Sequence, residues 1–451
     1  MKKVLSVVLA ILMLVSVGTV FCAAEEGAFG RIKWSLSEDG TLTISGDGPL
    51  AGGSMTYMLY GEKIKSVIIE EGVTDIASNA FYQLPNLKTV KLADTVERIG
   101  GYAFNECRAL EEATFGSGLK KIDAHAFRGC ESLREALLPE GTEEISSHAF
   151  YQCKKLETVN IPDSLKSLGG YVFAECCSLK SAKIPASVSE IGLYCFYECS
   201  SLDELTIAEG IRDIGSNAFR GCGMLKNVDL PNTLQSIGDH AFMDCVSLQS
   251  ANLPDSLTSL GPYAFYNCSS LKKISVPGTV SVISQFAFYN CYADSIEIGD
   301  GVSLIEKGAF RRCAFASAVD MPLSVEKIEN GAFFGCDEVS KVTYPGTKEQ
   351  WERIDIEENN DALSAVSSSF VKTAYYTLGD VNRDGKVNSV DARFILRVSA
   401  RLDTATPEQE LLGNINEDDK LNSADARLAL RISARLIPAP EKQIELITDF
   451  E

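Results

Sequence analysis

Apolar residues recur in this chain with a period of 23 residues over most of its length. The most regular position holds a phenylalanine, and neighbours are 23 residues apart except for the 22 residues from Phe288 to Phe310. The series comprises Phe81, Phe104, Phe127, Phe150, Phe173, Phe196, Phe219, Phe242, Phe265, Phe288, Phe310 and Phe333. A fixed period of roughly 20 to 50 residues indicates stacked short units rather than one compact core.

Each unit repeats one internal pattern. Ile or Leu lies five residues before the Phe, Cys lies three residues after it in all units but the first, and a short alternating apolar run follows and often ends at Pro. One complete unit contains Ile145, Phe150, Cys153, Leu156, Val159, Ile161 and Pro162. The alternation predicts one short β-strand per unit, which Pro ends because it lacks a ladder donor. The stretch between Phe and Cys suits a single turn.

This pattern resembles the BspA-like leucine-rich repeat family over about residues 60–345. The resemblance implies an α/β repeat, a leucine-rich repeat solenoid of about twelve 23-residue units at 60–343, with an N-terminal cap hairpin at 25–59 and a C-terminal cap at 344–366. Because one unit cannot bury its own apolar face, stacked units would share a continuous core. With strands about 4.8 Å apart, the rod would be roughly 55–60 Å long.

Eleven cysteines occupy one position of the repeated unit, after the Phe. A cysteine-rich exported chain suggests either a disulfide framework or buried thiols. Since every member of this set would point into the core, where Cys behaves as a small hydrophobe, we predict a ladder of buried thiols. The ladder comprises Cys107, Cys130, Cys153, Cys176, Cys199, Cys222, Cys245, Cys268, Cys291, Cys313 and Cys336, and leaves out Cys177 and Cys195.

The histidines, His125, His148 and His240, also share one position, which Tyr fills in other units. We expect half-buried packing there, because a metal site made from His125 and His148 lacks further ligands. The sequence has no evident nucleophile–base pair, phosphate loop, zinc motif or pair of convergent carboxylates, so we predict that the protein is not an enzyme. Its formal net charge of -20 argues against nucleic-acid binding.

Two rows of residues are predicted to face outward. The outward strand row, from Lys91 to Thr343, is small and polar without aromatic rings and gives no carbohydrate signal. The residue after each Phe is mainly Tyr or Arg, types enriched at protein interfaces, although a solvated edge that covers neighbouring turns is the alternative. This second row contains Tyr82, Arg128, Tyr151, Tyr197, Arg220, Tyr266, Tyr289, Arg311 and Phe334.

Residues 1–24 have the pattern of a secretory signal peptide. Lys2 and Lys3 precede an apolar stretch at 4–20, and small residues follow at Ala23 and Ala24. An uncleaved membrane anchor is the alternative interpretation. No later segment is apolar over a length that spans a bilayer, so we expect a secreted, extracellular protein.

After Tyr376 the 23-residue period stops and a second duplication begins, with an offset of 34 residues. Each copy has a loop with oxygen-bearing side chains or a backbone carbonyl at six spaced places, which suits calcium and its roughly six to eight oxygen ligands. The candidate ligands are Asp380, Asn382, Asp384, Lys386, Asn388 and Asp391 in the first loop, and Asn414, Asn416, Asp418, Lys420, Asn422 and Asp425 in the second. A helix follows each loop, and the first, at 390–402, is expected to bury Leu396 and Leu402. Asn414 and Asp419 replace an acid and a glycine in the second loop, so weaker calcium binding is expected there.

The duplicated loop and helix resemble a type I dockerin at 377–437. The resemblance implies a small all-α domain that binds two calcium ions and docks to a cohesin domain of a scaffoldin. It also implies that the two copies permit docking in either of two orientations. The contact residues it implies are Ser389, Val390, Arg397 and Arg401 in the first copy, and Ser423, Ala424, Arg431 and Arg435 in the second.

These features together predict a secreted, non-catalytic binding or structural component of a cellulosome-like complex in polysaccharide-degrading machinery. The dockerin would anchor it, and the solenoid would recognise a protein, a cell surface or a polymer. Two alternatives stay open: a cell-surface adhesin, and an enzyme, either a glycoside hydrolase or a peptidase. Residues 367–376 are expected to be a linker and residues 438–451 a loosely held acidic tail.

Overall fold

The structure is a computed structural model that describes residues 25–50, 56–368, 372–382, 386–416, 418, 420–434, 438 and 443–448. The expected signal peptide at 1–24, the candidate ligand Asp384 and the candidate contact residue Arg435 lie outside the described residues. The chain divides into a solenoid part, up to Val342 with 355–365, and a C-terminal part, 343–354 with 366–451. Each part is described by itself.

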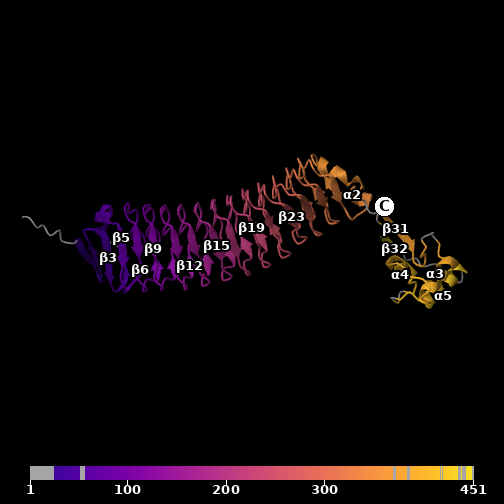
Figure 1. Cartoon of the computed structure of the whole chain (residues 1–451), viewed down its shortest axis with the longest axis horizontal. Helices are drawn as coiled ribbons and strands as arrows, with labels where there is room; N and C mark the ends of the chain where they lie inside the picture. Colours follow the sequence, from indigo (N-terminus) through magenta and orange to yellow (C-terminus); the bar gives the residue numbers. More distant parts are fainter. Residues whose placement is uncertain are drawn as a thin grey trace, which may run out of the picture. The chain divides into compact units, whose positions relative to one another are not determined.

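The solenoid units contain two short strands each, where the sequence predicted one (Figure 1). The first row is β5 (Ser66–Ile69), β7 (Thr89–Lys91), β9 (Glu112–Thr114), β11 (Glu135–Leu137), β13 (Thr158–Asn160), β15 (Ser181–Ile184), β17 (Glu204–Ile207), β19 (Asn227–Val228), β21 (Ser250–Ala251), β23 (Lys273–Val276), β25 (Ser295–Ile298), β27 (Ala318–Asp320) and β29 (Lys341–Thr343). The second row is β6 (Val73–Ile76), β8 (Arg98–Ile99), β10 (Lys121–Ile122), β12 (Glu144–Ile145), β14 (Ser167–Leu168), β16 (Glu190–Ile191), β18 (Asp213–Ile214), β20 (Ser236–Ile237), β22 (Ser259–Leu260), β24 (Val282–Ile283), β26 (Leu304–Ile305), β28 (Lys327–Ile328) and β30 (Asp355–Ile356). Most strands of the second row have two residues, too few for an alternating pattern to reveal them.

Parallel pairing at the repeat period joins the units. Glu135 pairs with Thr158 in the first row, and Lys121 pairs with Glu144 in the second. Because a slip of one residue would turn every core side chain outward, the apolar pattern fixes this register. The first row is not continuous: among the described residues no backbone hydrogen bond links β13 to β15.

In the solenoid the chain around each Phe forms tight turns rather than helices. In one unit His148 and Gln152 have positive φ of 62° and 61°, flanking Phe150. The amide of Phe150 donates to the carbonyl of Val172 at 3.0 Å, and the amide of Gln152 donates to that of Ala174 at 2.9 Å, both in the next unit. The turn therefore directs its backbone donors along the rod, and this satisfies polar groups that the core would otherwise bury unpaired.

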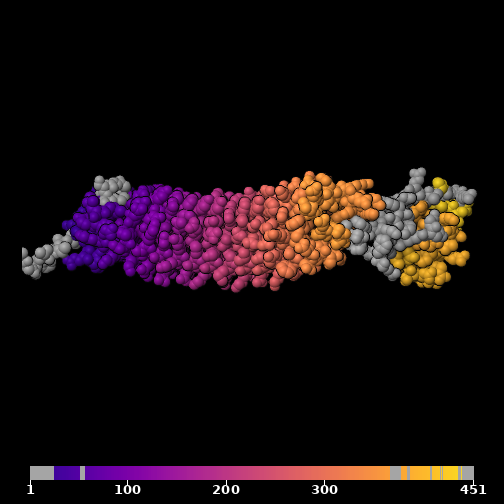
Figure 2. Space-filling view, turned by 90° about the horizontal axis from the view of Figure 1, so that it is seen from above, coloured from indigo at the N-terminus to yellow at the C-terminus, as the bar shows by residue number. Residues whose placement is uncertain are grey.

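The phenylalanines form one stack through the core. Their ring centroids lie between 5.0 Å, for Phe81 and Phe104, and 5.6 Å, for Phe288 and Phe310. All twelve rings are buried. Figure 2 shows the outer face of the same units following one another from indigo to orange. The solenoid of stacked units that the sequence predicted is confirmed.

The expected ladder of buried thiols is also present. All eleven ladder cysteines are buried, and every described cysteine is unpaired. Each thiol donates to the carbonyl of a Phe in the preceding unit, as from Cys153 to Phe127 at 3.3 Å. Burial raises the pKa of thiols such as those of Cys153 and Cys176, which therefore stay protonated. Cys177 is the described cysteine with partial exposure.

Hairpins close the N-terminal end of the solenoid. Strands β1 (Glu25–Phe29), β2 (Ile32–Leu36) and β3 (Thr41–Gly46) are antiparallel, and β3 then pairs in parallel with β5. Strand β4 (Gly48–Leu50) begins the second row, and the 3-10 helix η1 (Thr56–Lys63) buries Tyr57. The Tyr57 ring stacks on Phe81 with the ring centroids 5.7 Å apart, and so adds one ring to the phenylalanine stack before its first member. The 3-10 helix η2 (Asp361–Ser368) comes after β30.

The C-terminal part contains four helices among its described residues: α2 (Lys348–Trp351), α3 (Ser389–Ser399), α4 (Pro407–Gly413) and α5 (Ser423–Ser433). A small core joins α3, α4 and α5 through Val381, Ala392, Ile395, Leu412, Ala426 and Ala429. Strand β31 (Lys372–Thr377) pairs antiparallel with β32 (Gln443–Thr448). Residues 367–376 were expected to be a linker and residues 438–451 a loose tail, but these segments contain the two strands. The strands were not predicted because pairing between segments so far apart in the sequence leaves no local signal.

The thiol ladder predicts the chemical reactivity of the native protein. A thiol-specific reagent at mildly alkaline pH should modify Cys177 first, because the other described thiols are buried and out of its reach. Absorbance of the released dye measures this, and denaturant should then expose the ladder. In a Cys177→Ser variant the first phase should vanish, whereas several fast-reacting thiols in the native protein would contradict the ladder.

Candidate functional site

The first loop of the C-terminal part places two buried carboxylates beside its helix. The side chains of Asp380 and Asp391 have no solvent exposure. Asp391 accepts hydrogen bonds from the amides of Asn382 at 3.2 Å and Asn388 at 2.8 Å. Asn388 caps α3, and its side chain accepts from the amide of Val390 at 2.8 Å. The cap therefore holds the last candidate ligand against the loop.

The second loop repeats this geometry at the 34-residue offset. The buried Asp425 accepts from the amides of Asn416 at 3.1 Å and Asn422 at 2.9 Å. Asn422 caps α5 as Asn388 caps α3. Both copies thus have the same hydrogen bonds around the last acid, which indicates a duplicated structural motif.

The other candidate ligands of the second loop are joined to one another. The amide of Asp418 donates to Asn414 Oδ1 at 3.2 Å, and Asn416 Nδ2 donates to the Asp418 carboxylate at 2.9 Å. Asn422 Nδ2 reaches the same carboxylate at 3.3 Å and the carbonyl of Lys420 at 2.9 Å. Oxygen atoms from all these places therefore gather in one small loop.

The donor set fits calcium better than other metals. Carboxylate, amide and carbonyl oxygens are the hard ligands that calcium takes, and soft or nitrogen ligands are missing from these loops. A buried carboxylate is costly unless a cation or several donors compensate its charge, and Asp391 and Asp425 are fully buried. In the described part of the chain, no group of three or more His, Cys, Asp or Glu is placed so that it could hold a metal ion.

Helices α3 and α5 expose equivalent apolar and basic side chains. Leu396 of α3 is 50% exposed and its counterpart Leu430 of α5 is 49% exposed. Leu402 is 67% exposed, so the expected burial of Leu396 and Leu402 is wrong; Ile395 supplies the core contact instead. The described contact candidates Ser389, Val390, Arg397, Arg401, Ser423, Ala424 and Arg431 are all exposed. Arg is among the residue types enriched at protein interfaces.

On the solenoid, aromatic rings two residues before the Phe form a second stack. Tyr102, His125, His148, Tyr171 and Tyr194 stack in series with centroids 4.5 to 4.6 Å apart. The rings cover one another's faces, so only their edges are presented to solvent. The histidines were expected to pack against their neighbours, but the continuous stack was not predicted, although the 23-residue spacing of Tyr and His is a signal for it.

The Tyr and Arg side chains that follow the Phe in each unit contact one another between neighbouring units. The Arg128 guanidinium lies 5.3 Å from the Tyr151 ring and that of Arg220 lies 5.8 Å from Tyr197. Tyr266 stacks on Tyr289 at 4.5 Å. These contacts link neighbouring units, as the edge-covering alternative requires.

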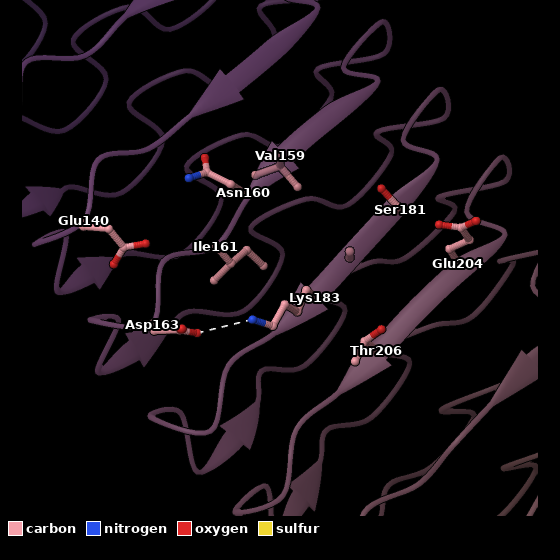
Figure 3. A pocket seen from close by; sticks show the side chains of 10 residues that line it. Glu140, Val159, Asn160, Ile161, Asp163, Ser181, Lys183, Glu204 and Thr206 are labelled. Carbon is pink, nitrogen blue, oxygen red and sulfur yellow. Dashed lines mark ion pairs between the residues drawn. The ribbon is translucent and has the colours of Figure 1, made fainter.

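A polar hollow of about 420 Å³ lies on the strand face where β13 and β15 separate (Figure 3). Asp163 and Lys183 form an ion pair of 3.7 Å there, and Asn160 turns back to bond the backbone of Leu138. The lining residues are Glu140, Val159, Asn160, Ile161, Asp163, Ser181, Ala182, Lys183, Glu204 and Thr206. Its carboxylates are all exposed, unlike the sheltered acid of a glycosidase.

The fold and loops define a leucine-rich repeat solenoid joined to a loop–helix duplication. The BspA type leucine-rich repeat region matches residues 55–176, 120–249 and 235–354, and the dockerin type I domain matches residues 378–431. The chain belongs to the BspA-type leucine-rich repeat family and carries a type I dockerin domain. Neither is a catalytic family, and type I dockerins bind calcium.

Solved bacterial structures are similar to this chain. A leucine-rich repeat protein from Bacteroides ovatus is 27% identical, with 71% of this chain and 88% of that chain covered and a TM-score of 0.53. A leucine-rich cell surface protein from Faecalibacterium prausnitzii is 27% identical, with 74% and 98% covered and a TM-score of 0.42. The comparison with curated proteins found no match. None of the helices in the described residues is long and apolar enough to cross a membrane.

The histidine stack predicts a pH dependence of stability. Burial, followed by the nearby His148 and Arg128, lowers the pKa of His125 to about 4 from its usual 6.5. Folding therefore disfavours the proton, and stability should be full above about pH 6.5 and decline toward pH 4. His125→Tyr, which inserts the residue of other units, should reduce this decline by on the order of 1–2 °C in melting temperature. The melting temperatures of the unaltered protein and of the His125→Tyr variant, measured from pH 7 to pH 4, test this prediction. An equal fall in melting temperature for both proteins would contradict it.

Proposed function

We propose that this protein is a secreted, non-catalytic binding component of a cellulosome-like complex. Its dockerin anchors it to a cohesin domain of a scaffoldin, and its solenoid recognises a protein, a cell surface or a polymer in polysaccharide-degrading machinery. The observation that carries the proposal is the duplicated loop, in which Asp391 and Asp425 are buried with the same pair of backbone donors.

Two calcium ions order the docking surface. The first ion is held by Asp380, Asn382, Asp384, Lys386, Asn388 and Asp391, and the second by Asn414, Asn416, Asp418, Lys420, Asn422 and Asp425, with Lys386 and Lys420 using their backbone carbonyls. The second site is weaker because Asn414 supplies no charge. Since the last acid of each loop also belongs to the cap of α3 or α5, calcium binding fixes the helices that present the contact residues.

The docking faces are the exposed sides of α3 and α5. They present Ser389, Val390, Arg397 and Arg401 from the first copy, and Ser423, Ala424 and Arg431 from the second. Arg435 is added as a contact residue of the second copy on its sequence position alone. The half-exposed Leu396 and Leu430 add an apolar centre to each face. Exposed arginines in a chain with a formal net charge of -20 favour a partner whose docking surface carries carboxylates.

The solenoid acts as a rigid recognition rod in this proposal. Its stacked rings and cation–π pairs stiffen one edge of the rod. The polar hollow at β13 and β15 offers acidic and basic side chains, as well as hydrogen-bond donors and acceptors, to a ligand. An adhesin would use the same rod against a cell surface. The exposed carboxylates of the hollow favour recognition over catalysis.

Binding of a cohesin tests the proposal. The full-length chain should bind a recombinant type I cohesin domain in millimolar calcium and lose that binding in excess chelator, as measured by calorimetry. Asp391→Ala together with Asp425→Ala should weaken binding by at least about tenfold, because the two changes remove a candidate ligand and the capping-box acid from both copies. Asp229→Ala together with Asp255→Ala, at two exposed acids of the solenoid outside the hollow, is the matched control and should bind normally. Binding that persists in chelator would contradict the proposal.

A further inference from the structure

The two copies of the docking face differ at one charged position, and the inference drawn from it rests on the proposed function. The 34-residue offset relates Leu396 to Leu430 and Arg397 to Arg431. It relates Asp403 to position 437, which is Ile in the sequence. The first copy therefore has an acid that the second lacks.

Asp403 engages the docking arginine of the first copy directly. Arg397 Nε lies 2.5 Å from Asp403 Oδ2, and Nη2 lies 3.0 Å from Oδ1. This two-pronged contact uses the planar fork of the guanidinium, the geometry with which Arg recognises a carboxylate. The pair lowers the pKa of Asp403, so the acid is ionised at neutral pH. Among the described residues no acid lies within ion-pair distance of Arg431.

The pairing changes what each face offers to an acidic partner. Arg397 has to leave Asp403 before its fork can bind a carboxylate of the partner, and Asp403 itself repels that carboxylate. Arg431 meets neither obstacle from a described residue. An exposed ion pair of this kind changes an affinity by up to about fivefold.

We propose that Asp403 biases docking, so that a cohesin domain with a carboxylate-bearing face engages the protein mainly through α5 and Arg431. Charge complementarity supports this partner, because Arg393, Arg397, Arg427 and Arg431 are all exposed on the two helices. The apolar difference acts in the other direction, since the 56% exposed Val390 corresponds to the smaller Ala424. The preference for α5 is therefore electrostatic and should diminish as salt is raised.

Arginine substitutions in the full-length chain test the bias. The probe is a panel of recombinant type I cohesin domains, titrated at low salt in calcium. Arg431→Ala should weaken binding by up to about sixfold, because docking through α3 stays available, and Arg397→Ala should weaken it by less than about twofold. In the Asp403→Asn background the two orientations should become about equally favourable, so Arg397→Ala and Arg431→Ala should each weaken binding by about twofold. Asp403→Asn alone should not weaken binding.

A matched control separates the pair from a general charge effect. Glu410→Gln makes the same charge change at an exposed acid of α4 and should leave both arginine effects unaltered. Equal losses from Arg397→Ala and Arg431→Ala, or a larger loss from Arg397→Ala, would overturn the inference alone. If no cohesin of the panel binds the unaltered protein, the proposed function fails and the inference fails with it.

Discussion

The structure depends on hydrogen bonds that satisfy its buried polar groups. In the solenoid the partners come from the next repeat unit, and in the C-terminal part they come from the same loop. In the solenoid the tight turn of each unit buries backbone amides, and these reach the carbonyls of the next unit, as Phe150 reaches Val172. In the C-terminal part the buried Asp391 and Asp425 are each held by two backbone amides of their own loop. Buried groups of this kind are costly when unpaired, so the repeat and the loops fix the chain in one arrangement.

The two parts satisfy this constraint in ways that suit different roles. The solenoid pairs its groups internally: its rings stack, its thiols donate to Phe carbonyls, and Arg128 and Arg220 lie over tyrosine rings of neighbouring units. Little of its chemistry is reactive, which agrees with a rod that presents a surface. The dockerin loops, in contrast, concentrate carboxylates in a small volume whose charge calls for a cation. In the proposed function, metal binding there is coupled to the folding of α3 and α5 and so to docking.

Spacing made much of this predictable from the sequence. Phe, Cys and the strand residues of the first row recur at one period, and the loop ligands recur at another, so each position could be assigned by its copies. The strands of the second row were missed because two residues give no alternation. The exposure of Leu396 was missed because the pattern of one helix cannot tell which of its sides the other helix covers. The β31–β32 pairing and the Asp403–Arg397 contact depend on tertiary geometry with no local signal.

Calorimetric unfolding of the full-length chain with and without calcium tests the central claim most directly. The account predicts two transitions, of which the one from the dockerin shifts to lower temperature or disappears in excess chelator, while the solenoid transition stays in place. A single transition with the same midpoint in calcium and in chelator would contradict it.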